Sequence, residues 1–156
     1  MTSLARRRRA LMGKQGGAAK NGLVPGTYTG GSSEWVVDAD GVVSVVSWSR
    51  TAPNGVTIPF ASAVPANVGD SIRVVVQKTN GTMSASPYSY VNVGPAILTN
   101  QTWSNGATAV DKTITYDGET PIGHFYADYR VGAPTFNNYQ FKVFVYVNGN
   151  QVIPGV

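Results

Sequence analysis

The chain has 156 residues, of which 42% are hydrophobic and only 13% are charged, whereas globular domains average about 25% charged residues. It contains no cysteine and a single histidine, His124. This composition excludes disulfides, thiolate metal ligands, a cysteine nucleophile and a multi-histidine metal centre. We therefore expect neither a cofactor nor a metal site.

Charge is distributed very unevenly along the chain. Residues 1–20 carry six basic side chains and no acidic one, whereas residues 21–156 carry six basic and eight acidic side chains. The formal net charge of +4 therefore divides into +6 on the N-terminal segment and −2 on the remainder. Such segregation is typical of an arm that binds a partner and a body with a separate role.

The basic segment has the pattern of a short amphipathic helix. Ser3 is a suitable N-cap, and Leu4 and Leu11 lie seven residues apart on one helical face, with Met12 beside them. A lone helix of about nine residues is unstable in water, so we expect it to need a surface on which to dock. Glycine-rich sequence up to Gly22 predicts a flexible tether. We therefore expect an anchor arm and tether at 1–22 and a folded domain at 23–156.

The second part of the chain predicts an all-β domain. Short runs rich in β-branched residues alternate with Gly, Pro, Asn and Asp. Pro59 indicates an edge strand, and Asn80-Gly81 predicts a tight hairpin. Strands at this spacing favour a jelly-roll-like two-sheet β-sandwich, with an immunoglobulin-like sandwich as the alternative. The expected strands are 34–37, 42–49, 56–60, 71–77, 88–93, 96–103, 112–116, 123–130, 139–147 and 151–153.

The sequence favours neither acid–base catalysis nor calcium binding. Four candidate groups fall within twelve residues: Asp117, Glu119, His124 and Asp128. However, Asp117-Gly118-Glu119 is typical of a turn, and strand alternation places His124 and Asp128 together on a solvated sheet face. The Asp38-to-Gly41 stretch is similar to the start of a calcium loop, but Val42 and Ser49 stand where ligands are needed, which favours a β-turn. We expect no enzyme.

Aromatic residues concentrate in the last third of the chain. Along 139–147, alternation assigns Tyr139, Phe141, Val143 and Val145 to the core and leaves Phe144 and Tyr146 on the other side. Together with Tyr126 on the preceding strand, Phe144 and Tyr146 form our candidate ligand or oligomer surface, with subunit contact favoured over sugar stacking.

The arm itself admits two functions. In the first, Leu4, Leu11 and Met12 insert into an apolar groove while Arg6, Arg7, Arg8 and Arg9 pair with carboxylates of another protein. In the second, the four arginines neutralise nucleic-acid phosphates. The leucine–methionine stripe has no role in a purely electrostatic arm, so we favour the protein anchor. No apolar run is long enough to span a membrane, and we expect no membrane insertion.

Taken together, the stretch from Ser3 to Met12, the glycine-rich tether and the small Thr/Val/Asn-rich β domain resemble small structural proteins of tailed bacteriophages, of the tail, baseplate or head-fibre and decoration type. The resemblance implies a non-enzymatic component of the virion, usually a homo-oligomer. Such a protein attaches to other virion proteins by its N-terminus and displays its sandwich for decoration or for adhesion to a host-surface glycan. Two alternatives stay open: a small icosahedral capsid protein whose arginine arm binds nucleic acid, and a carbohydrate-binding module.

Overall fold

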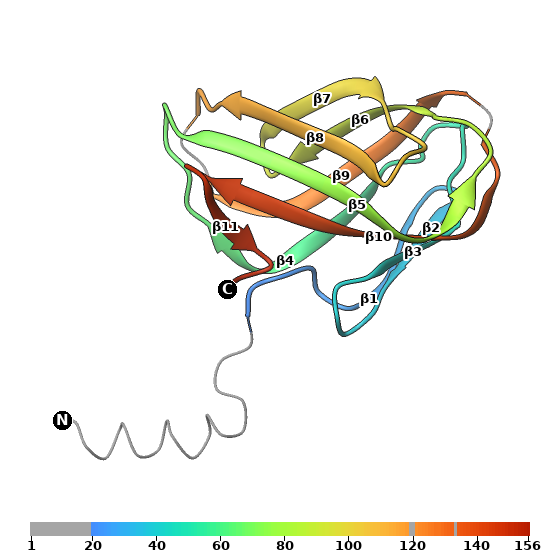
Figure 1. The fold of residues 1–156 in the computed structure, drawn as a ribbon, viewed down its shortest axis with the longest axis horizontal. Helices are drawn as coiled ribbons and strands as arrows, with labels where there is room; N and C mark the ends of the chain where they lie inside the picture. Colours follow the sequence, from blue (N-terminus) through green and yellow to red (C-terminus); the bar gives the residue numbers. More distant parts are fainter. Residues whose placement is uncertain (1–19, 119–120, 133) are drawn as a thin grey trace, which may run out of the picture.

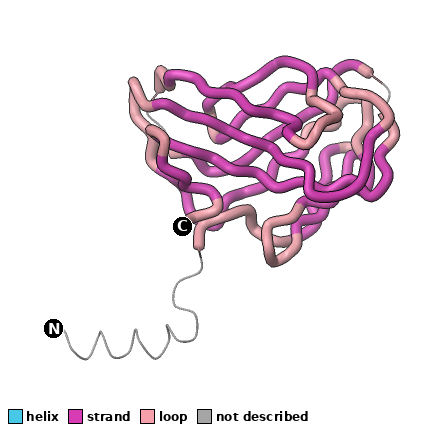
Figure 2. The backbone as a smooth tube through the Cα atoms, viewed as in Figure 1, coloured by secondary structure: helices cyan, strands magenta, loops and turns pink. Residues whose placement is uncertain are grey.

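The computed structural model describes residues 20–118, 121–132 and 134–156. The anchor residues from Leu4 to Met12, the short helix expected there, and Glu119 lie outside the described residues. Within them the chain forms eleven strands and no helix, which confirms the all-β prediction (Figure 2). The strands are β1 (Gly26–Gly30), β2 (Ser33–Val37), β3 (Val43–Ser47), β4 (Val56–Val64), β5 (Ser71–Met83), β6 (Tyr88–Val93), β7 (Ala96–Thr102), β8 (Thr108–Thr115), β9 (Ile122–Val131), β10 (Phe136–Val147) and β11 (Asn150–Ile153).

The strands build two antiparallel sheets that pack face to face (Figure 1). The larger sheet has the order β1-β2-β3-β10-β5-β8, with β11 also paired to β10. The smaller sheet has the order β4-β9-β6-β7. A two-layer sandwich results, in which each sheet buries one face against the other.

The pairing pattern identifies the winding of the sandwich. In the larger sheet β3 pairs with β10 and β5 with β8, while in the smaller sheet β4 pairs with β9 and β6 with β7. The strands from β3 to β6 are thus matched in reverse order by those from β7 to β10, as in one long antiparallel hairpin rolled into two layers. This is the jelly roll, which confirms the first prediction over the immunoglobulin-like alternative.

Large apolar side chains fill the space between the sheets. Trp35 and Trp103 are fully buried, and Trp35 packs edge-on against Phe141 with ring centroids 5.4 Å apart. The predicted inward face of β10 is confirmed, because Tyr139, Phe141, Val143 and Val145 are all buried.

The Asn80-Gly81 hairpin prediction was wrong. β5 runs without reversal from Ser71 to Met83, and Gly81 lies inside it with a φ of +79°. A side chain at Gly81 would overlap the backbone of Asn138, at a point where the β5–β10 register shifts. The glycine therefore serves a close approach of two backbones and not a turn.

The connecting loops gather at two opposite ends of the sandwich (Figure 1). At one end the β3–β4 loop meets the β9–β10 loop, where Arg50 Nη1 donates to the carbonyl of Gly132 at 2.9 Å. At the other end the amide of Gly69 donates to the carbonyl of Tyr116 at 2.8 Å. Both contacts join loops that are far apart in sequence, so the loops at each end of the sandwich are held together by hydrogen bonds.

Candidate interaction surfaces

Residues 21–25, which we call the root segment, connect the basic arm to the sandwich. The root segment runs antiparallel beside β4: Val24 N–H donates to the carbonyl of Pro59 at 2.9 Å, and Ala61 N–H donates to the carbonyl of Gly22 at 2.8 Å. Leu23 is 8% exposed and belongs to the core. Pro59 was correctly expected on an edge strand, since β4 ends its sheet. The root segment covers part of that edge, so the arm begins from a fixed place.

Asn21 closes this arrangement. Its side-chain amide donates to the carbonyl of Ser62 at 2.6 Å, and its side-chain oxygen accepts from the N–H of Ser62 at 2.8 Å. Its own carbonyl accepts from the N–H of Gly155 at 2.7 Å. The sequence placed Asn21 and Gly22 in the flexible tether; in the structure both are hydrogen-bonded to the β domain.

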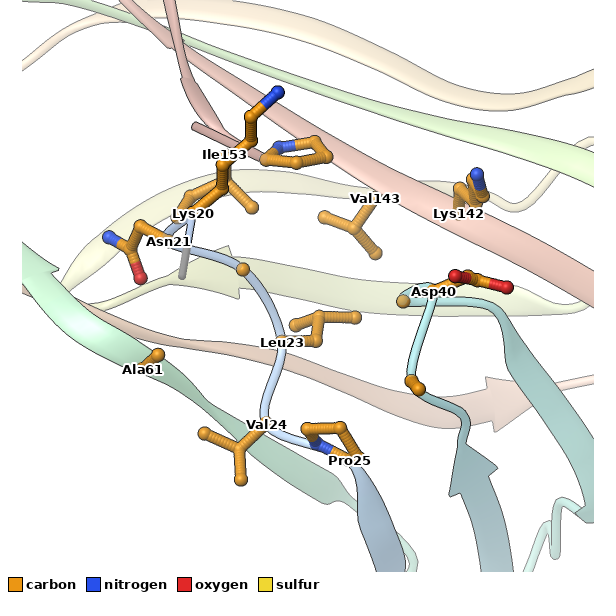
Figure 3. A pocket seen from close by; sticks show the side chains of 14 residues that line it. Lys20, Asn21, Leu23, Val24, Pro25, Asp40, Ala61, Lys142, Val143 and Ile153 are labelled. Carbon is orange, nitrogen blue, oxygen red and sulfur yellow. The ribbon is translucent and has the colours of Figure 1, made fainter. Parts of the chain in front are cut away.

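A cavity of about 500 Å³ opens beside the root segment (Figure 3). Its apolar walls come from the root segment, from β10 and from the C-terminal residues; they include Leu23, Val143 and Ile153. Figure 3 shows Asp40 and Lys142 together on one side and Lys20 on another. The volume is in the range of cavities that bind small ligands or side chains.

The outer face of the smaller sheet carries a polar and aromatic cluster around Asp128. Arg130 binds the Asp128 carboxylate through Nε at 3.0 Å and Nη2 at 3.1 Å, and its guanidinium stacks on Tyr90, 4.6 Å from the ring centre. The hydroxyl of Tyr126 donates to Asp128 at 3.2 Å. The hydrogen bond to Asp128 raises the pKa of Arg130, whereas burial, helped by the negative charge of Asp128, raises the pKa of Tyr126.

A similar cluster lies on the outer face of the larger sheet. Arg73 binds both carboxylate oxygens of Asp111 at 2.9 Å and stacks on Tyr146, 5.2 Å from the ring centre. The hydrogen bond from Arg73 holds the pKa of Asp111 below its usual value. Unlike Asp128, which is buried, Asp111 is nearly half exposed. The second cluster is therefore screened by water to a larger extent.

The three aromatic residues of the predicted ligand or oligomer surface are split between these faces. Tyr126 lies on β9 in the smaller sheet, whereas Phe144 and Tyr146 lie on β10 in the larger sheet. They therefore cannot form one continuous surface. Alternation identified them as outward-facing but carried no signal about which sheet each strand would join.

The acid–base groups, which the sequence did not favour as catalytic, do not form one cluster within the described residues. Asp117 is exposed on the β8–β9 loop, while His124 lies opposite Pro59 and Asp128 is bound by Arg130 and Tyr126. Burial lowers the pKa of His124, which favours its neutral form.

Asp38 and Asp40 form a turn, as predicted. The Asp38 carboxylate accepts from the backbone N–H groups of Asp40 and Val42 at 2.8 and 2.9 Å. Within the residues that the structure describes, no group of three or more His, Cys, Asp or Glu side chains could hold a metal ion. In the same residues no helix is long and apolar enough to cross a membrane.

The fold and its surfaces define this chain as a jelly-roll domain with a basic N-terminal arm. Comparison with known proteins found no matching family model, no matching curated protein and no matching solved structure.

Proposed function

We propose that this chain is a non-enzymatic structural protein of a virus particle, and that its basic arm is the element through which it assembles. The rolled pairing of β3–β6 with β7–β10 supports this proposal, because viral capsid proteins are among the proteins that use the jelly roll. The +6 charge on residues 1–20 is the second support. Fold alone does not define function, so the combination of the two carries the argument.

Within this class, the winding favours a shell-forming capsid subunit. The hydrogen bonds of Asn21 with Ser62 and Gly155 hold the arm's starting point at one place on the sandwich. In a symmetric shell, every arm would then leave on the same side, where packaged nucleic acid could neutralise it. In this role the arginines contact phosphates and the sandwich forms the wall.

The second candidate is the attachment or decoration protein of a tailed phage, anchored to another virion protein. It is favoured by Leu4, Leu11 and Met12, whose apolar stripe contributes nothing to phosphate binding. Here the arginines pair with acidic side chains of the socket protein, and the sandwich points outward, where a host-surface glycan could bind. Both candidates are homo-oligomeric and belong in the virion.

The test compares the full chain with a variant in which Arg6, Arg7, Arg8 and Arg9 are alanine. Binding to a single-stranded oligonucleotide is measured between 50 and 300 mM salt, and particles are sought by electron microscopy. If all six basic groups of the arm contact phosphates, the logarithm of the affinity falls with the logarithm of the salt concentration with a slope of about −4. The alanine variant is expected to reduce that slope to about −1 to −2.

A variant with four lysines in place of the arginines is the matched control and should retain the slope, because it retains the charge. If the alanine variant binds the oligonucleotide as the natural chain does, with the same salt dependence, the capsid version is wrong. If particle incorporation is lost with serine at Leu4, Leu11 and Met12 but not with alanine at the arginines, the tailed-phage anchor is supported instead. A chain that forms no particle but binds a glycan array would contradict both and support a carbohydrate-binding module.

A further inference from the structure

We propose that the cavity beside the root segment is a docking site for Leu11 and Met12 of the chain's own arm. Docking would hold the arm against its own sandwich before assembly and leave Arg6 to Arg9 accessible to a partner. This inference does not depend on the nature of the particle, because it concerns an isolated molecule in solution.

The cavity offers an apolar surface with room for side chains. Leu23, Val143 and Ile153 line it but are themselves buried, and its volume is about 500 Å³ (Figure 3). The open apolar surface comes from other lining residues that are partly or fully exposed, among them Val24, Pro25 and Pro154. Unfilled apolar surface of this kind is most stable when it is covered by apolar groups. Leucine and the flexible, unbranched methionine are suited to filling an irregular opening.

The position of the cavity selects the occupant. Lys20 lines the cavity, so the chain that precedes the described residues begins at its edge. Only seven residues, 13–19, separate Met12 from Lys20. A chain of that length reaches at most roughly 25 Å, and a short flexible link gives an effective concentration in the millimolar range. At micromolar protein, the chain's own arm therefore outcompetes the arm of a second copy.

The charges at the cavity indicate that apolar contact carries the docking. Lys20 and Lys142 line the cavity together with one carboxylate, that of Asp40. This balance does not attract four arginines, so they gain little by approaching it. We therefore expect docking to change little between 50 and 300 mM salt, in contrast to phosphate binding.

Cross-linking tests the proposal directly, because the natural chain has no cysteine. Met12→Cys is combined with Ala61→Cys, since Ala61 is exposed and lines the cavity. The matched control combines Met12→Cys with Ala107→Cys, an exposed position between β7 and β8 that does not line the cavity. At low micromolar protein under mild oxidation, we expect the first pair to form an intrachain disulfide at least tenfold faster than the control.

Two results would overturn the proposal: equal rates for the two pairs, or a disulfide that forms only between chains. A second measurement uses the full chain with Leu11→Ser and Met12→Ser and no engineered cysteine. If the arm covers the cavity, this variant should bind a hydrophobic fluorescent dye several-fold more strongly than the natural chain. It should also exchange the backbone hydrogens of residues 39–41 faster. Unchanged dye binding and unchanged exchange in the serine variant would equally contradict the docking.

Discussion

The backbone N–H of Gly155 donates a 2.7 Å hydrogen bond to the carbonyl of Asn21, so the two ends of the β domain meet at one residue. The Asn21 side chain simultaneously pairs with both backbone groups of Ser62 on β4. The place where the arm starts and the place where the chain ends are therefore on the same side of the sandwich (Figure 1). A tag added after Val156 should consequently emerge beside the arm.

Replacing Asn21 with alanine should loosen this junction. The variant loses two hydrogen bonds with Ser62, each worth roughly 0.5–1.5 kcal/mol at most in this exposed position. We expect the free energy of unfolding to fall by about 1 kcal/mol in urea titrations, and the hydrogens of Ala61 and Gly155 to exchange faster. Asn100→Ala, at an exposed position on β7, is the control and should change neither quantity. Equal effects of the two substitutions would contradict a specific role for Asn21.

The two arginine–tyrosine clusters should differ in their contribution to stability. Arg130→Met leaves the buried carboxylate of Asp128 without its cation, and we expect a loss of about 1–3 kcal/mol. Arg73→Met removes a pair in which both side chains are close to half exposed and screened by water, so we expect a smaller loss than at Arg130. Urea denaturation of both variants measures the difference. Adding Asp128→Asn to Arg130→Met should recover part of the lost stability, because no unpaired carboxylate then remains buried. A larger loss of stability for Arg73→Met than for Arg130→Met would contradict the expected difference between the clusters.

Gly30, at the end of β1, and Gly123, on β9, form a matched pair that tests how closely the backbone of β1 approaches the β3–β4 loop. A side chain at Gly30 would overlap the carbonyl of Gly55, and a backbone atom cannot move aside cheaply. Gly30→Ala should therefore destabilise the fold by about 1–3 kcal/mol. Gly123→Ala on β9 meets no atom within 4 Å and should be neutral, or stabilising by up to about 1 kcal/mol, because alanine restricts the unfolded chain. Thermal denaturation of the two variants decides whether these backbones approach as closely as described.

His124 should make stability depend on pH near neutrality. Burial lowers its pKa in the folded protein, so the unfolded chain binds the proton more readily, at about pH 6.5. Stability is therefore full above pH 6.5 and is lost as the pH falls from there through the folded pKa. We expect the free energy of unfolding to fall as the pH is lowered from 7.5 to 5.5, and the effect to be modest because His124 is partly exposed. His124→Gln should make the free energy of unfolding less dependent on pH in this range. If the pH dependence is unchanged in this variant, groups other than His124 cause it.

Local patterns predicted most of the β domain, because burial on one face imposes alternation that can be read from the residues. The runs around Trp35, Val74 and Phe141 lie within observed strands, and the side of β10 that was predicted to face the core is buried. β1 was missed, since Gly-Thr-Tyr-Thr-Gly lies mostly exposed at a sheet edge and has no apolar alternation. Tyr126, Asp128 and Arg130 lie on one face of β9, as the two-residue period of a strand dictates, and hydrogen bonds link them there.

Composition and sequence pattern determined the division of charge between arm and body, the all-β class and the absence of cysteine chemistry. They also determined that Tyr126, Phe144 and Tyr146 point outward. These follow from residue identity and from neighbours along the chain. The tertiary structure alone decided that Tyr126 and Phe144 lie on opposite sheets, that Gly81 permits a close approach to Asn138, and that Asn21 joins β4 to the C-terminal residues. Each of these depends on which distant strands pair. That choice is made by packing two whole sheets against each other, and no single segment of the chain encodes it.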